Sequence, residues 1–357
     1  MRFDLALRPR AQYRPARKTK AIGSMSQHSE PLVIDVDTGI DDALALLYAC
    51  AHDEAQILGV STVVGNVSLA AATRNTRAVL ALAGRADIPV WPGAATALSI
   101  AVRDASEVHG ETGLGHAVLP DPDEPADALH AADSIIAAAR SHPGRLILCA
   151  VGPLTNIALA VMREPELPRL VKRFVIMGGA YSDSGNVTPA DEFYFWLDAE
   201  AARIVFRAFG GVGGAPVIAI GLDVTRKTII DESDVAAIAS RIAGKPHGAK
   251  LTRFLEDASR FYFERMEKML GKRIFTMHDP LAIAVALDPT LVETRLAAVD
   301  VETTGRLTTG ATIVDWRGQW GRLANTEVAV AVDADRFRRL FFDAMVRLAD
   351  GAMKATT

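Results

Sequence analysis

The sequence predicts an α/β protein built on an open, mostly parallel, Rossmann-like sheet with helices on both faces. Short runs of apolar, often β-branched residues alternate with longer segments that have helical periodicity. The runs are apolar at nearly every position, which is typical of strands buried on both faces. Parallel strands need a crossover between them, and the helical segments supply it.

The predicted elements follow one another in a regular order. Apolar runs predict five core strands, at 31–36, 55–65, 145–152, 171–179 and 215–224. Helical patterns between them predict helices at 41–53, 69–84, 155–166 and 198–209. From about Leu296 the pattern changes to shorter strands, which we expect to be added C-terminal antiparallel strands, at 297–304, 311–318 and 327–333. A last helix is predicted at 334–350.

Composition indicates a globular protein with a small-molecule partner. Half of the 357 residues are apolar, and the formal net charge is −4. Nucleic acids and anionic membranes require a strongly basic face, so neither is expected as a partner. No stretch has the roughly 18 to 20 apolar residues of a membrane helix. Cys50 and Cys149 form no disulfide framework or zinc spacing, which suits the cytoplasm.

The first 30 residues differ from the rest of the chain. They are rich in Arg and Lys, nearly free of acids and without sustained periodicity. We expect residues 1–30 to be a disordered basic extension. Two interpretations are open. The segment has a targeting role, or the start is extended and Met25 is the true initiator methionine. Residues 31–352 are expected to form a single domain, because no repeat or long linker divides them.

Polar residues gather where the predicted strands end. Asn66 follows the second strand, and Val151 follows the third. Asn186 and Glu192 lie beyond the fourth strand, and His278 with Asp279 open a late helix. Open parallel sheets bind ligands beyond the carboxyl ends of their strands. These distant segments are therefore expected to converge on one crevice.

Four acids crowd the end of the first strand in VIDVDTGIDDALALL, namely Asp35, Asp37, Asp41 and Asp42. Two carboxylates about 5 Å apart repel by ~3 kcal/mol at an effective dielectric near 20. A helix cap accounts for one acid but not for four, so a bound cation is expected. An EF-hand would need an acid at position twelve, which is Leu46 here.

One alternative is a magnesium-dependent phosphatase of the D-x-D type. Such an enzyme also carries its nucleophile at the end of the first strand, here Asp35. It would further require a lysine and a late acidic pair. The late cluster in this chain is His-Asp-Pro at 278–280, without an obvious lysine partner. This alternative therefore ranks second.

Six motifs together resemble the inosine-uridine-preferring nucleoside hydrolase family. They are DVDTGIDDALAL, VVGN, HGETGLG, VGPLTNIALA, MGGAY with GNVTPADEF, and HDPLA, in family order between about Leu32 and Asp335. The resemblance implies hydrolysis of the N-glycosidic bond of ribonucleosides to free base and ribose. It also implies a homodimer or homotetramer.

The resemblance further implies a Ca²⁺ site and a catalytic base. Asp37, Asp42 and Asp279, with the main-chain carbonyl of Val151, would hold the ion, and hard oxygen ligands suit calcium. Asp37 would also take a proton from a calcium-bound water. That water attacks the anomeric carbon through an oxocarbenium-like transition state, with inversion.

The same resemblance assigns the rest of the pocket. His278 would donate a proton to the leaving base, or line the base pocket. The segment Glu107–Pro120 would be a loop over the pocket that excludes water. The ribose and its surroundings would be contacted by Asp41, Asn66, His109, Met177, Asn186, Glu192 and Tyr194.

Tyr194 departs from the family pattern, which usually has an asparagine there. A tyrosine is bulkier and cannot present the paired donor and acceptor of an amide. This difference leaves open weaker turnover, another glycoside, or a phenol that substitutes for the amide. It also motivates a third interpretation, a nucleoside-binding protein with weakened turnover.

Overall fold

The computed structural model describes residues 29–351 apart from 53, 99–105, 123–125, 128 and 212. The expected basic extension therefore lies almost wholly outside the described residues. No helix in the described part of the chain is long and apolar enough to cross a bilayer.

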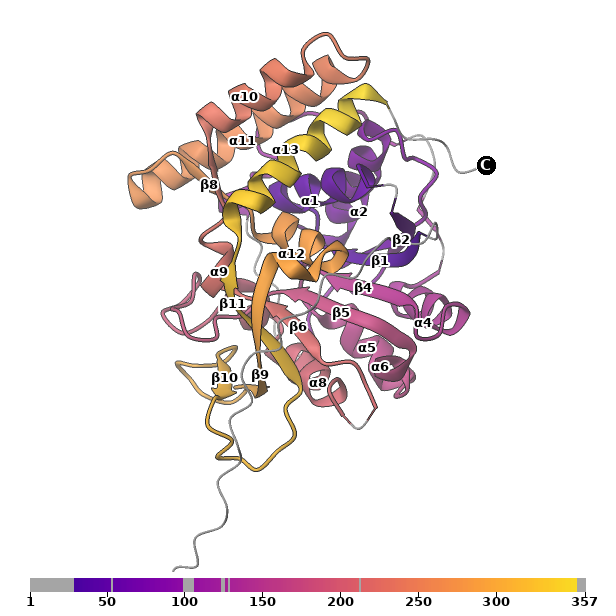
Figure 1. Cartoon of the computed structure of the whole chain (residues 1–357), viewed down its shortest axis with the longest axis vertical. Coiled ribbons are helices and arrows are strands. Elements are labelled where there is room, and N and C mark those ends of the chain that lie inside the picture. The colour runs from indigo at the N-terminus through magenta and orange to yellow at the C-terminus, as the bar shows by residue number, and fades with distance from the viewer. Residues whose placement is uncertain are drawn as a thin grey trace, which may run out of the picture.

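A nine-stranded sheet forms the centre of the molecule (Figure 1). Its strands lie in the order β10-β9-β11-β6-β5-β4-β1-β2-β3. In chain order they are β1 (Glu30–Val36), β2 (Ala55–Thr62), β3 (Val90–Pro92), β4 (Leu146–Ala150), β5 (Val171–Met177), β6 (Val217–Ile220), β9 (Val292–Val301), β10 (Thr312–Asp315) and β11 (Thr326–Val332). All pairs from β3 to β11 are parallel, and β9 pairs antiparallel with both β11 and β10. The predicted α/β class, parallel core and C-terminal antiparallel strands are confirmed.

Helices cover both faces of the sheet, as predicted (Figure 1). On one face α12 packs on β4 and β5 and against α1, with α13 beyond them. This layer contains α1 (Ile40–Cys50), α2 (Leu69–Leu82), α10 (Glu232–Ile242), α11 (Gly248–Leu270), α12 (His278–Leu287) and α13 (Ala334–Asp350). The other face carries α4 (Ala131–Ser141), α5 (Thr155–Arg163), α6 (Leu167–Leu170) and α8 (Ala199–Ala208).

Several short elements complete the fold. They are α3 (Ser106–His109), α7 (Phe193–Leu197), α9 (Leu222–Thr225), the 3₁₀ turn η1 (Pro289–Leu291), and a separate antiparallel pair, β7 (Ile229–Asp231) with β8 (Ile274–Thr276). The sequence patterns did not predict β3, β7 or β8. Each has three residues, which is too short for a periodicity to show.

One predicted strand runs into a helix. The apolar run 215–224 was expected to be extended throughout, but β6 ends at Ile220 and α9 begins at Leu222. Gly221 is the N-cap residue of α9, and the amide of Thr225 donates to the carbonyl of Gly221 at 3.1 Å. The last residues of this run, Leu222 to Val224, thus belong to a turn of helix at the carboxyl edge of the sheet.

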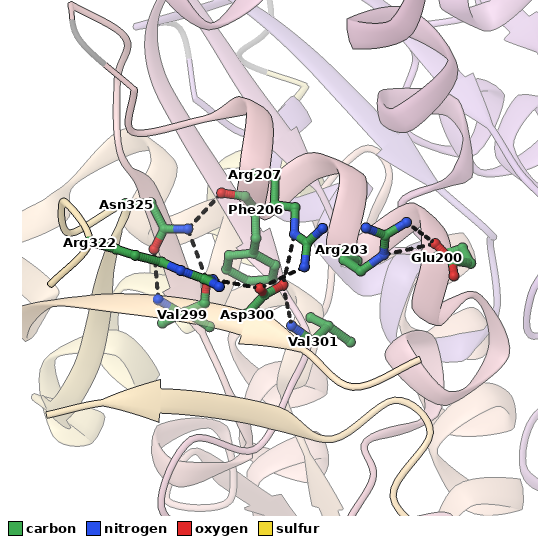
Figure 2. Close-up of polar contacts among 9 residues, drawn as sticks. All are labelled: Glu200, Arg203, Phe206, Arg207, Val299, Asp300, Val301, Arg322 and Asn325. Atoms are coloured by element: carbon green, nitrogen blue, oxygen red, sulfur yellow. Dashed lines mark hydrogen bonds and ion pairs between the residues drawn. The ribbon is translucent and has the colours of Figure 1, made fainter. Parts of the chain in front are cut away.

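The C-terminal strands are joined to α8 through side chains (Figure 2). Asp300 on β9 accepts hydrogen bonds from Arg207 at 3.0 Å and from Arg322 at 2.9 Å. Asn325 accepts from the amide of Val299 at 2.8 Å and donates to the carbonyl of Phe206 at 2.6 Å. These contacts hold the antiparallel addition against the parallel core.

Candidate active site

The predicted site residues lie at the point where the strand order reverses. From β3 to β6 the order is 3-2-1-4-5-6, and the chain winds outward in both directions from β1 and β4. Asp37 directly follows β1, and Val151 directly follows its neighbour β4. Such a switch point leaves a crevice at the carboxyl edge, because the connections diverge there.

Three carboxylates converge beside this crevice. Oxygens of Asp41, Asp42 and Asp279 lie within 4.8 Å of one another, and all three residues are buried. Asp41 and Asp42 occupy the first turn of α1, and Asp279 occupies the first turn of α12, which packs against α1. Helix N-termini favour negative charge, which offsets part of the repulsion. This buried triad could bind a metal ion.

The carboxyl oxygens in this cluster are only partly satisfied. Asp42 accepts from the amides of Asp37 at 3.1 Å and Gly39 at 2.9 Å. Among the described residues, no hydrogen-bond partner is found for Asp37 Oδ1, Asp41 Oδ1 or either oxygen of Asp279, and Asp41 Oδ1 lies 4.0 Å from Nδ1 of His109. Buried polar atoms are rarely left unpaired, so these four oxygens mark a place for a cation or a ligand.

Burial raises the pKa values of all four clustered acids, and repulsion from neighbouring acids adds to the rise for Asp37, Asp41 and Asp279. Burial, and secondly the negative charge of Asp42, raises the pKa of Asp37 well above its ordinary value. The same two causes raise the pKa of Asp41 to about 7. The pKa of Asp279 is also raised well above its ordinary value, mainly by burial and then by the charges of Asp41 and Asp42. Burial also raises the pKa of Asp42. A positive charge at this point would allow all four to ionise.

The predicted metal ligands and the observed triad overlap in Asp42 and Asp279. Asp37 lies at the same cluster, where its Oδ2 accepts from the amide of Asn66 at 2.5 Å. This close approach requires Gly65, because a Cβ there would overlap the Asp37 carboxylate. Asp37 is thus fixed through one oxygen and keeps Oδ1 without a partner among the described residues. Val151 is buried at the end of β4.

Asn66 and Tyr194 meet next to the acids. The side-chain amide of Asn66 donates to Asp42 Oδ2 at 3.1 Å and lies 3.4 Å from the phenolic oxygen of Tyr194. Burial, then Asp279 and Asp37, raise the pKa of Tyr194 well above its ordinary value. The phenol therefore keeps its proton and lies close to the carboxylates.

Glu192 and Asn186 organise the helix that carries Tyr194. The buried carboxylate of Glu192 accepts from the amides of Gly179 at 3.1 Å and Tyr194 at 3.1 Å. The exposed Asn186 accepts from the amide of Phe193 at 2.9 Å. Met177, buried, is the last residue of β5. In this structure both polar side chains are engaged with the backbone around α7.

The two predicted pocket histidines lie near each other and are neutral at pH 7. Burial, then His278, lowers the pKa of His109 to about 3. Nδ1 of His109 accepts from the amide of Ile40 at 3.1 Å, and the ring fits because Gly39 has no side chain. Burial, then Arg226, lowers the pKa of His278 to about 4. His278 therefore offers a neutral ring rather than an acidic imidazolium.

The described part of the predicted loop 107–120 is packed on the domain. Leu114 is buried, and the side-chain amide of Asn75 donates to the carbonyl of Thr112 at 2.7 Å. His116 pairs with Glu264 of α11 at 2.9 Å. The loop, which carries His109, therefore lies between α2 and α11.

Asp35 lies behind the cluster and connects strands. Its Oδ1 accepts from the Ser61 hydroxyl at 2.5 Å and from the Asn156 amide at 2.8 Å. The residue is fully buried, and burial raises its pKa to about 7. A D-x-D phosphatase would need this carboxylate as an exposed, ionised nucleophile, so the geometry does not support that alternative.

The sequence interpretation missed three residues of the segment around α9. Asp223, Thr225 and Arg226 lie between the Tyr194-bearing segment and His278, and Thr225 contacts the His278 ring at 2.8 Å. Their signal was the change from apolar to polar residues after Gly221. It was hidden because Leu222 and Val224 continue the apolar pattern of β6.

Comparisons with known proteins agree with this geometry. Residues 32–339 match the family model described as "Inosine-uridine preferring nucleoside hydrolase". The chain is 39% identical to a protein of that name from Leishmania major, over 89% of this chain and 98% of that protein. It is 36% identical to a "Pyrimidine-specific ribonucleoside hydrolase RihA" from a Shewanella species, over 89% and 96%. The solved "Purine-Preferring Ribonucleoside Hydrolase from Gardnerella vaginalis" has a TM-score of 0.83 and 33% identity, covering 90% of this chain and 99% of that one.

Proposed function

The chain belongs to the inosine-uridine preferring nucleoside hydrolase family, and from this premise we propose that it cleaves ribonucleosides to free base and ribose with a calcium ion and a water activated by Asp37. The observation that carries the proposal is a group of four buried carboxyl oxygens at the switch point of the sheet that have no hydrogen-bond partner in the described part of the chain. Such atoms need a cation, a substrate, or both.

The donor set fits calcium. Asp37, Asp42 and Asp279, with the Val151 carbonyl, would hold the ion, and Asp41 lies within the same cluster. All are hard oxygen donors of mixed carboxylate and carbonyl type, which Ca²⁺ accepts in flexible geometry. A bound calcium ion would supply positive charge that offsets the carboxylates and makes a neighbouring water more acidic.

Asp37 is suited to act as the base. Its Oδ2 is occupied by the Asn66 amide, whereas Oδ1 has no partner in the described part of the chain and can accept a proton from water. The water oxygen would bond to the anomeric carbon as the bond to the base breaks, with inversion. His278 would donate a hydrogen bond to the leaving base, which reduces the charge that develops there.

The sugar is proposed to lie between the acids and α7. Asp41 Oδ1 and the Tyr194 phenol offer an acceptor and a donor near one another. A site that pairs with hydroxyl groups rejects an analogue that lacks one, because a buried group is then left unpaired. Ribosides are therefore preferred to 2′-deoxyribosides.

A nucleoside panel with matched variants tests the proposal. Reducing sugar release would be measured for inosine, uridine, adenosine and cytidine with calcium present. Asp37→Asn should lower kcat by about 10³-fold, since it removes the base and a ligand. Asp87→Asn, at an exposed ion pair with Arg85, should leave kcat unchanged. Wild-type protein that holds calcium but releases no sugar from any of the four would contradict the proposal.

A further inference from the structure

The segment around α9 is anchored to the loop that precedes α7. The Asp223 carboxylate accepts from three consecutive amides, those of Tyr181 at 2.9 Å, Ser182 at 2.7 Å and Asp183 at 3.1 Å. Arg226 pairs with Asp183 at 2.9 Å. Three hydrogen bonds to one carboxylate and an adjacent ion pair fix α9 relative to this loop.

The other side of the same segment is joined to the residue before His278. The amide of Met277 donates to the carbonyl of Thr228 at 2.8 Å, and the Thr228 hydroxyl lies 3.2 Å from the Met277 carbonyl. These contacts involve only the Met277 backbone, so they place the start of α12 but leave the His278 ring free to rotate.

In the described part of the chain, one hydrogen bond holds that ring. The Thr225 hydroxyl lies 2.8 Å from His278 Nδ1, and Thr225 is fully buried. Among the described residues, His278 is the only hydrogen-bond partner found for this hydroxyl. A buried hydroxyl needs an acceptor for its proton, and Nδ1 of a neutral ring provides one. The ring proton then resides on Nε2, on the opposite side of the imidazole.

We propose that Thr225 is a positioning residue that orients His278 with its Nε2–H toward the leaving base. The inference rests on the proposed role of His278 at the base. A hydroxyl suits this task because it can donate to Nδ1 of the neutral ring. Without it, the ring could turn or carry its proton on Nδ1, and the donor facing the base would be lost.

Loss of the Thr225 hydroxyl should affect the departure of the base rather than the attack of water. The bond between the anomeric carbon and the base nitrogen breaks, and its electron pair leaves with the base. The water oxygen replaces it on the sugar, and the water proton passes to Asp37. The hydrogen bond from Nε2 lowers the cost of the charge on the departing base. A leaving group that is stable as an anion does not need that bond.

The test compares a poor and a good leaving group on the same sugar. Thr225→Val keeps the side-chain shape and removes the hydroxyl, and Thr225→Ser restores it. For inosine and uridine, kcat/KM should fall by about 10- to 100-fold in Thr225→Val and by less than about 3-fold in Thr225→Ser. With p-nitrophenyl β-D-riboside, both variants should stay within about 3-fold of wild type.

Thr228→Val is the matched control, because among the residues that the structure describes the buried Thr228 hydroxyl contacts only the backbone carbonyls of Thr225 at 2.8 Å and Met277 at 3.2 Å, and not the His278 ring. It should affect both substrate types equally. Equal losses on both substrate types in Thr225→Val, or the same split in Thr228→Val, would overturn the inference, as would full nucleoside activity in Thr225→Val. Wild-type protein inactive on every riboside would instead contradict the proposed function.

Discussion

The acids at the end of β1 and the start of α1 have different environments although they share one short motif. Asp35 is committed to Ser61 and Asn156, whereas Asp42 accepts two backbone amides. Asp37 and Asp41 each keep one oxygen that has no partner among the described residues. Asp35 also keeps one such oxygen, Oδ2, so what separates it from the candidates for chemistry is its place within β1, behind the cluster.

Tyr194 allows a sharp test at the residue scale. Tyr194→Phe removes the phenolic hydroxyl near the acids, so we expect KM for inosine and uridine to rise by about 10-fold, which corresponds to ~1.4 kcal/mol of lost binding. Stability should hardly change, because the Asn66 amide keeps its bond to Asp42. Steady-state kinetics and thermal unfolding measure the two effects.

A second tyrosine serves as the control for this substitution. Tyr48 is buried on α1 and stacks on Phe341, with 6.2 Å between ring centroids. Tyr48→Phe should leave KM unchanged. If Tyr194→Phe also leaves KM unchanged, the phenol does not contact the sugar. If it raises kcat, the phenol obstructs the sugar site instead.

At the scale of elements, the sequence could predict strands and helices whose pattern of apolar residues reflects burial. It could not predict elements whose position depends on specific side-chain contacts. The five core strands are recognisable because their runs are apolar on both faces, and the last helix is found at the predicted residues, Ala334–Asp350. α9 could not be found in this way, because its position depends on Asp223 and Arg226 binding a loop about 40 residues earlier.

Asn325 provides a prediction for the junction between α8 and the C-terminal strands (Figure 2). Its side chain binds both backbone groups of Val299 and the carbonyl of Phe206. Asn325→Ala leaves these groups unpaired, so the free energy of unfolding should fall by about 2–4 kcal/mol. Urea denaturation measures this loss, and Gln319→Ala, at an exposed residue, should cost less than about 0.5 kcal/mol.

Activity should not follow stability in this variant. The next residue, Thr326, pairs with Val217 at the start of β6. The candidate site lies at the opposite, carboxyl ends of the strands. The folded fraction of Asn325→Ala should therefore keep kcat/KM within about 2-fold. A large fall in kcat/KM without a loss of stability would show that the junction affects the site.

At the scale of the whole molecule, the structure brings several of the predicted site residues together because they follow strand ends. Asn66 and Asp37 are found in direct contact, and Asp42 and Asp279 fall within one cluster. The precise grouping could not be predicted. Asp41 joins Asp42 and Asp279 because α12 packs on α1, and no local pattern encodes the packing of two distant helices.

That packing makes the metal a link between distant parts of the chain. Asp41 and Asp42 lie in the first turn of α1, and Asp279 lies in the first turn of α12. These two helices pack against each other, and α12 packs on β4 and β5 in the middle of the sheet. Calcium at 100 times its Kd should stabilise the folded state by about 2.7 kcal/mol, so chelation should lower Tm by roughly 4 °C. Thermal unfolding in calcium and in a chelator measures this difference.

Asp279→Asn separates metal binding from general stability. It removes one charge from a repelling cluster, so the chelated variant should unfold at a Tm equal to or above that of chelated wild type. It also removes a ligand, so calcium should raise its Tm much less than in wild type. Asp87→Asn should keep the full calcium response. If wild type shows no calcium-dependent rise in Tm, the four free oxygens belong to the substrate alone, and the cation assigned to this cluster is wrong.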